Sequence, residues 1–211
     1  MKRLPAAVAL LVALTAGAGV ARASAPGDDL IARMAAVNPN LHTFTATLHA
    51  HVALKSFPFL AADVVGTYYY KQPDKNKVVL QGGVPLIAQQ FDKLYAHIES
   101  PARWHAVYTV TLVSDDGRTT LFALVPRKHG NVARIEAAVD DKSATVTRMR
   151  WNYDNGGYAE MINQYGSVAG FVVVQSQSGH VQEPGYVADI TSVLDEYKMN
   201  PTLSDDLFDQ P

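Results

Sequence analysis

The stretch Thr43-Phe44-Thr45-Ala46-Thr47-Leu48-His49-Ala50-His51-Val52-Ala53-Leu54 decides the fold of this chain. Polar and apolar side chains alternate along it almost strictly as far as Val52. Successive side chains of a strand point to opposite faces of its sheet, so the alternation predicts one long strand. Its apolar face carries Phe44, Ala46, Leu48, Ala50, Val52 and Leu54, and its polar face carries Thr43, Thr45, Thr47, His49 and His51. We therefore expect a sheet with one buried and one solvated face.

Further strands are predicted on the C-terminal side of this stretch, separated by short polar turns. Their expected bounds are Asp63–Lys71, Lys77–Gln81, His105–Val113, Arg118–Pro126, Val132–Val139, Thr145–Tyr153, Tyr158–Tyr165, Phe171–Gln177 and Tyr186–Tyr197. Turns such as Asp116-Gly117 and Asn155-Gly156 are typical of hairpins. Connections this short leave no room for crossover helices, so the sheet should be antiparallel.

Helical patterns are few. Asp28–Val37 predicts a short amphipathic helix with Asp28 as its N-cap, and residues 85–92 predict a second short helix. A sheet of about ten strands must curl and either close or be covered. The sequence therefore predicts a mainly β, curved antiparallel sheet with a few covering helices.

Composition predicts a single globular domain over residues 24–211 of the 211. Hydrophobic residues make up 48% of the chain and charged residues 18%, which excludes a disordered protein. The net charge of −2 and the lack of a basic block argue against nucleic acid as a partner. There is no cysteine, so disulfides, thiol nucleophiles and thiolate metal sites are excluded.

Residues 1–23 have the pattern of a secretory signal peptide. Lys2 and Arg3 precede an apolar run from Leu4 to Val20, and Ala21-Arg22-Ala23 offers small residues for cleavage after Ala23. The alternative is an uncleaved anchor, but the run is short for a membrane span and no cysteine follows for lipid attachment. We expect a soluble, periplasmic mature protein.

Two groups of residues suggest chemistry. His49 and His51 share one strand face and could bind a transition metal if a third ligand came from a neighbouring strand; the alternative is a solvated strand face. The carboxylate pairs Asp28-Asp29, Asp115-Asp116, Asp140-Asp141 and Asp205-Asp206 lie at turns or a helix start, where aspartate makes local hydrogen bonds. We therefore expect no metal, no cofactor, no catalytic residues and no enzymatic activity.

Three passages resemble the LolA/LolB/RseB-like superfamily of periplasmic lipoprotein carriers and lipid-binding proteins. They are the hairpin Gly66–Val78, the strand–turn–strand Asn131–Trp151, and the C-terminal run Tyr197–Phe208. The resemblance implies an incomplete (half) β-barrel whose apolar concave face is plugged by helices. It covers nearly the whole mature chain. It also implies a hairpin motif at Pro73 and Lys77 that closes the lid; carriers usually have arginine at the second position, and lysine lacks its planar fork.

The resemblance implies a carrier, expected to be a monomer, that sequesters a lipid or the acyl chains of a lipoprotein. Membrane donor or acceptor proteins would be its further partners. The expected cavity residues are Phe44, Leu48, Val52, Leu54, Tyr69, Val78 and Trp151. The alternative is an RseB-like sensor domain that binds a protein partner in envelope-stress signalling. Such sensors usually carry a second C-terminal domain, and the chain stops after Pro211, so we expect the carrier.

Two further expectations concern aromatic residues. The tyrosines and tryptophans of the strands are either core and cross-strand partners or the lining of a lipid cavity. The C-terminal tail after Pro201 should fold back and dock Leu207 and Phe208 against the sheet, beside the N-terminal helix, because a free tail would leave the Phe208 ring in water. The alternative is a frayed terminus.

Overall fold

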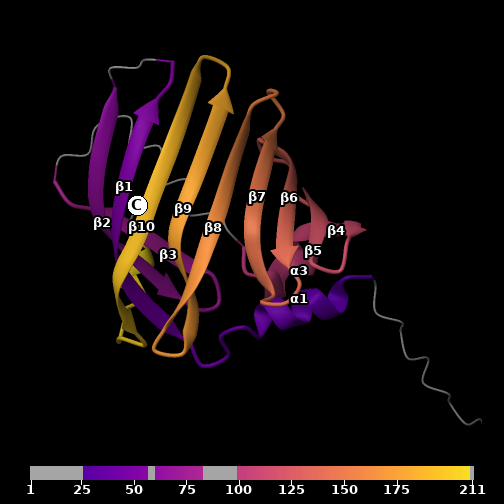
Figure 1. Cartoon of the computed structure of the whole chain (residues 1–211), viewed down its shortest axis with the longest axis horizontal. Helices are drawn as coiled ribbons and strands as arrows, with labels where there is room; N and C mark the ends of the chain where they lie inside the picture. The colour runs from indigo at the N-terminus through magenta and orange to yellow at the C-terminus, as the bar shows by residue number, and fades with distance from the viewer. Residues whose placement is uncertain (1–25, 57–59, 83–98, 210–211) are drawn as a thin grey trace, which may run out of the picture.

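The fold is one ten-stranded, fully antiparallel sheet that curls without closing (Figure 1). It is described here from a computed structural model that covers residues 26–56, 60–82 and 99–209. The strands are β1 Thr43–Leu54, β2 Ala61–Lys71, β3 Lys75–Leu80, β4 Tyr108–Asp115, β5 Thr119–Pro126, β6 Val132–Asp140, β7 Thr145–Tyr153, β8 Tyr158–Val168, β9 Phe171–Glu183 and β10 Tyr186–Met199. The predicted mainly β, half-barrel architecture is confirmed.

The strand order is β3-β2-β1-β10-β9-β8-β7-β6-β5-β4. Strands that follow one another in sequence therefore pair, except for β3 and β4, and the first strand also pairs with the last. The long strand that the alternation predicts lies between β2 and β10, with Leu48 opposite Gly66 on one side and Leu194 on the other. The edges are β3 and β4, and no pairing joins them among the described strands.

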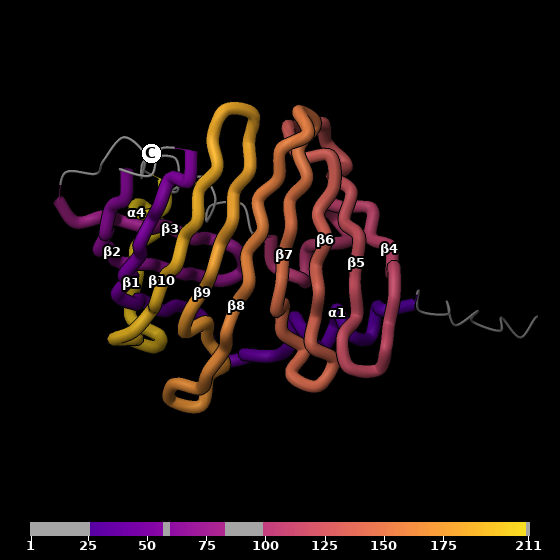
Figure 2. Tube along the Cα trace, turned by 45° about the horizontal axis from the view of Figure 1, so that its top comes forward, coloured from indigo at the N-terminus to yellow at the C-terminus, as the bar shows by residue number. Residues whose placement is uncertain are grey.

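The helical segments lie toward the inner, concave side. Helix α1 spans Asp28–Ala35, and a second helical segment consists of the 3-10 turn η2 Pro101–Arg103 followed by α3 Trp104–Val107. Figures 1 and 2 show α1 across the β4–β7 half of the sheet, away from β1–β3. The Arg33 Nη1 donates to the Asp141 carbonyl at 2.7 Å, which fixes the end of α1 to the β6–β7 turn. No described helix is both long and apolar enough to cross a membrane.

Several local expectations were wrong or incomplete. The N-cap of α1 is Gly27 rather than Asp28. Residues 105–107, predicted as strand, are helical, and β4 starts at Tyr108. Gly66 pairs in regular register with both β1 and β3. A Cβ at this position would lie 2.9 Å from the Val79 carbonyl oxygen, so glycine permits the close approach of β3. The predicted signal peptide and the predicted helix over residues 85–92 lie outside the described residues.

The core consists of two clusters rather than one. The larger cluster joins α1, Trp104, the inner faces of β4–β10 and Val52 of β1, and its members Phe122, Leu124 and Val139 are fully buried. The smaller one contains Ala46, Leu48 and Leu194 of β1 and β10, with aromatic residues such as Phe44 packed against it. Among the described residues, these two clusters do not merge into one.

The tail after β10 returns to the first hairpin. Helix α4, Asp206–Asp209, packs against β3, and the Lys75 ammonium lies 5.9 Å from the centre of the Phe208 ring. The prediction that the tail docks Leu207 and Phe208 on the sheet is confirmed, since both side chains are partly buried. Its expected position beside the N-terminal helix is wrong, because α4 lies at the β1–β3 side and α1 at the opposite side (Figure 2).

The tail also changes the expected polar face of β1. The Thr43 hydroxyl donates to the Pro201 carbonyl at 2.6 Å, and Thr43 is buried rather than solvated. Asn200 secures this corner, because its side-chain Oδ1 accepts from the backbone N–H of His42 at 2.8 Å. The first residue of the alternating stretch is thus covered by the last segment of the chain, which strand periodicity alone does not reveal.

Candidate functional site

A cavity of about 520 Å³ lies between the two core clusters. Its wall includes members of both: Met34, Trp104, Met149, Trp151 and Met161 from the larger, and Phe44, Tyr68, Val174, Leu194 and Tyr197 from the smaller. The exposed area of the wall is mostly apolar. Cavities that bind small molecules typically measure about 300–1,000 Å³ and are lined mainly by apolar side chains. The size and the lining therefore suit an apolar ligand.

Four parts of the fold build this wall. Helix α1 and the segment after it contribute Met34, Val37 and Leu41; the β2–β3 hairpin contributes Tyr68, Tyr70 and Pro73; the segment before β4 contributes Pro101 and Trp104; and the sheet contributes β1 and β7–β10. The sheet curves around the space while the other parts cross its concave side. The cavity thus exists only in the folded chain, because no single element contains more than a fraction of its wall.

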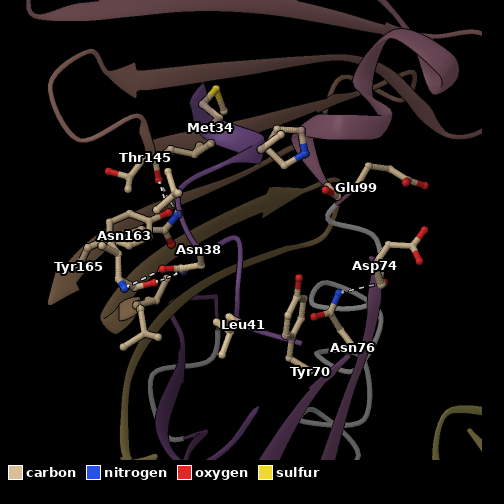
Figure 3. A pocket seen from close by; sticks show the side chains of 18 of the residues that line it. Met34, Asn38, Leu41, Tyr70, Asp74, Asn76, Glu99, Thr145, Asn163 and Tyr165 are labelled. Carbon is tan, nitrogen blue, oxygen red and sulfur yellow. Dashed lines mark hydrogen bonds between the residues drawn. The ribbon is translucent and has the colours of Figure 1, made fainter. Parts of the chain in front are cut away.

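On one side of the cavity, the polar side chains bond to the protein itself (Figure 3). The Asn38 amide donates to the Val172 carbonyl at 2.7 Å and accepts from the Val172 N–H at 3.0 Å. Asn163 Nδ2 and the Tyr165 hydroxyl both donate to the Val146 carbonyl at 2.9 Å. Burial raises the pKa of Tyr165 to about 12, so this hydroxyl stays protonated as the donor. These groups complete the backbone bonding of β7 and β9.

On the other side, Asp74, Asn76, Tyr70 and Glu99 come together (Figure 3). Arg103 forms ion pairs with both acids: its Nη1 contacts Asp74 Oδ2, and the same nitrogen lies 3.5 Å from Glu99 Oε2. One cation is therefore shared by two carboxylates. This group connects the β2–β3 turn to the helical segment Pro101–Val107.

Aromatic side chains form the wall on the hairpin side. The Phe44 ring stacks on Tyr68 and Tyr70 with centroid distances of 5.6 and 5.1 Å, and it contacts Tyr197 at 5.5 Å. The Tyr197 hydroxyl donates to the Val174 carbonyl, and burial raises its pKa. These rings are cross-strand partners and also line the cavity, so the two interpretations of the strand aromatics are compatible here.

Solved structures show which known fold this is. No protein-family model matches the sequence, and no curated protein matches it. A DUF1329 family protein from Desulfovibrio piger aligns with a TM-score of 0.63 at 12% identity, over 86% of this chain and 95% of that chain. A LolA superfamily protein from Nitrosomonas europaea aligns with a TM-score of 0.63 at 9% identity, over 88% and 98%. The chain has the LolA fold.

A third structure agrees. An outer membrane lipoprotein-sorting protein domain from Vibrio parahaemolyticus aligns with a TM-score of 0.65 at 8% identity, over 85% of this chain and 94% of that chain. The resemblance seen in the hairpin, the strand–turn–strand and the C-terminal run is thereby confirmed at the level of the LolA fold. At these identities the likeness concerns the path of the chain and not the ligand.

The predicted cavity residues fall into two sets within this LolA fold. Phe44, Trp151 and Pro73 lie on the cavity wall. Leu48 and Val52 are buried in the core clusters, Leu54 and Val78 pack against those clusters, and Tyr69 and Lys77 lie opposite each other in the β2–β3 ladder, all outside the wall. The alternation identified the inner face of β1, but only its Phe44 end reaches the cavity. Contact of any of these residues with a ligand stays a prediction.

Sequence analysis missed much of the wall, including Met34, Asn38, Tyr70, Asp74 and Glu99. One signal was available for Met34, which belongs to the apolar stripe of the predicted helix. Asp74 and Glu99 gave no comparable signal. They lie 25 positions apart in loop segments, and only the tertiary fold brings both against Arg103.

His49, His51 and Asp140 contact polar side chains of the protein itself. His51 Nδ1 lies 2.7 Å from Asp63 Oδ1, and His49 Nε2 lies 3.7 Å from Asp195 Oδ1. Within the described chain, no three His, Asp or Glu side chains come together as metal ligands would. Asp140 accepts from the Ser143 hydroxyl and N–H at 2.7 Å, which lowers the pKa of its carboxyl and stabilises the β6–β7 turn.

Proposed function

We propose that this protein binds a lipid, or the acyl chains of a lipoprotein, in the cavity between its two core clusters, and carries it through the periplasm. The observation that supports this most directly is a largely apolar space of about 520 Å³ at the place where core packing would otherwise be continuous. Folded proteins normally fill their interiors at crystal-like density. An apolar space of this size inside a curved sheet is therefore best explained by a ligand that fills it.

The energetics suit reversible sequestration. Burying one methylene contributes about 0.8 kcal/mol, so an acyl chain of about 16 carbons would gain roughly 12 kcal/mol before costs. Ordering the chain and displacing the groups that cover the cavity offset much of that gain. The balance permits binding that is tight enough for transport and weak enough for release. The proposal assigns no catalytic step and no cofactor to the protein.

A cavity-filling variant tests the proposal. Val172 lines the cavity and is half-buried, so the indole of Val172→Trp would occupy the ligand space without adding a charge. We expect the fluorescence of bound N-phenylnaphthylamine, an uncharged apolar probe, to be strong with the natural protein and about tenfold or more weaker with Val172→Trp. The matched control is Val125→Trp on an exposed position of β5 outside the cavity, where Val125 is 44% exposed.

Thermal melting of both variants separates loss of the site from loss of the fold. Val125→Trp should bind the probe as the natural protein does. A natural protein that does not bind the probe, or equal binding by a folded Val172→Trp, would refute the proposal that this cavity holds the ligand.

A further inference from the structure

The charged groups on the cavity wall all have the same sign. Among the described wall residues, Asp74 and Glu99 are the charged ones, and no lysine, arginine or histidine is present. Arg103 lies behind them and contacts both carboxylates. Among the described residues, one guanidinium opposite two carboxylates gives this side of the cavity a net negative charge. A ligand in the cavity therefore meets an acidic surface there.

The side chain of Glu99 has an oxygen whose hydrogen-bonding capacity is unused by the described residues. Its Oε2 atom is buried and, within the described chain, accepts no hydrogen bond, while Arg103 Nη1 lies 3.5 Å from it. Asp74 is the closer partner of that same nitrogen. A buried carboxylate oxygen without a donor is unfavourable, because it has given up water without replacing it. A donor from a ligand would restore the missing hydrogen bond.

On the opposite side of the cavity, three polar side chains already have hydrogen-bond partners. The Asn38, Asn163 and Tyr165 side chains already bond to backbone groups of the sheet. A polar head group placed there would have to break these bonds, whereas one placed at Glu99 would gain a bond. The cavity therefore has a direction: the polar head of an amphiphile belongs near Glu99, and its chain belongs against the apolar wall.

Resting on the proposed function, we infer that the cavity selects amphiphiles whose head group donates hydrogen bonds and carries no negative charge, such as an amide or an amine. An N–H of such a head would donate to Glu99 Oε2. A carboxylate or phosphate head would place an acceptor and a second negative charge against Glu99 and Asp74, which electrostatics in a partly buried site opposes. An acylated amino terminus, which is an amide, falls in the selected class, whereas a free fatty acid does not.

Three ligands with the same chain and different heads test the inference. Dodecanamide, dodecylamine and dodecanoate are used to displace bound N-phenylnaphthylamine from the full chain at neutral pH. We expect the amide and the amine to displace the probe at concentrations about tenfold or more below that of dodecanoate, since one repulsive contact in a partly buried site is worth at least that factor. Equal potency, or dodecanoate as the best competitor, would overturn the inference.

Failure of the inference and failure of the proposed function look different. If the probe does not bind the natural protein, the proposed function fails. If the probe binds and all three ligands displace it alike, the cavity still binds apolar chains and only the head-group selection is wrong.

The variant Glu99→Gln tests the residue itself. It keeps the shape of the side chain and removes the charge, so the advantage of the amine over dodecanoate should fall about fivefold or more. Asp154→Asn is the matched control, because Asp154 is an exposed turn residue outside the wall and the change removes the same charge. Asp74→Asn serves as a second variant if Glu99→Gln does not fold. An unchanged head-group preference in both cavity variants would contradict the role of these acids.

Discussion

Gly27 precedes α1 and is its N-cap. Its φ is +91°, a backbone conformation that residues with a side chain rarely adopt. A Cβ placed on it would lie 2.6 Å from Phe122 Cε1, and the Phe122 side chain is fully buried. The helix therefore begins at a point where the backbone touches the ring at the centre of the core.

We predict that Gly27→Ala destabilises the protein by about 2–4 kcal/mol, the sum of backbone strain and overpacking. Gly117→Ala is the control, because Gly117 has a φ of +78° but nothing within 4 Å of its Cβ position, so only the strain of about 1 kcal/mol applies. Urea denaturation measures both free energies of unfolding. Equal losses in the two variants would show that contact with Phe122 does not restrict this position.

Single residues also show what an alternating pattern can and cannot predict. Phe44 and Leu48 share the inner face of β1, as the pattern indicated, yet Phe44 lines the cavity and Leu48 is 3% exposed within the smaller core cluster. The pattern depends on the strand alone. Whether an inner residue meets a neighbour or a cavity depends on what lies across from it.

At the scale of elements, the tail from Leu203 to Asp209 is fastened to the β2–β3 hairpin. Asp205 Oδ1 lies 2.8 Å from Lys75 Nζ and 3.1 Å from Lys71 Nζ, and Lys71 Nζ donates to the Leu203 carbonyl at 2.9 Å. The hydrogen bond from Lys75 is the main reason why the pKa of Asp205 is lowered. The charge of one carboxylate thus helps to hold α4 on β3.

We predict that Asp205→Asn loosens the tail at neutral pH, and that acid does the same to the natural protein. A carboxyl whose pKa is lower in the folded than in the unfolded state stabilises the fold above its unfolded value of about 3.9. This contribution is lost as the pH falls through the folded-state pKa. Heteronuclear NOE values of the Leu207 and Phe208 amides measure the loosening.

The control for this prediction is Asp154→Asn, which removes the same charge from an exposed turn. It should leave the tail amides unchanged. Tail amides in Asp205→Asn that stay as rigid as those of the natural protein at neutral pH would show that apolar contacts of Phe208 hold the tail without the ion pairs.

The helical segment before β4 shows why one element was predicted wrongly. The alternation of His105–Val113 fits a strand, but Trp104 is 1% exposed and its Nε1 donates to the Glu99 carbonyl at 3.1 Å. Burying the indole against Phe122, with ring centroids 6.0 Å apart, favours a helical turn there. Tertiary packing of one large side chain overrides the local pattern.

At the scale of the whole molecule, the sheet is continuous while its core is divided. The first strand pairs with the last, so the smaller cluster forms only when β1 and β10 meet. In the part of the chain that the structure describes, the apolar side chains on the cavity wall lack packing partners on the cavity side. A ligand that fills it should therefore add to the stability of the whole fold.

We predict that N-phenylnaphthylamine raises the free energy of unfolding by about 2.7 kcal/mol when its free concentration is about 100 times its dissociation constant. Only the folded chain contains a wall drawn from both clusters, so the unfolded chain should not bind. Urea denaturation with and without the probe measures the shift. Val172→Trp, whose cavity is filled, should show almost none, and a shift of the same size in this variant would place the probe elsewhere.

The sequence by itself determined the antiparallel, mainly β architecture, the inner face of β1 and the return of the tail to the sheet. These features follow from local periodicity, from turn chemistry and from the cost of leaving an aromatic ring in water. Only the tertiary structure decided where the cavity lies and that Asp74 and Glu99 share Arg103 beside it. The reason is physical: strand periodicity assigns each side chain to a face, whereas a cavity depends on how far the sheet curves and on which distant segments cross its concave side.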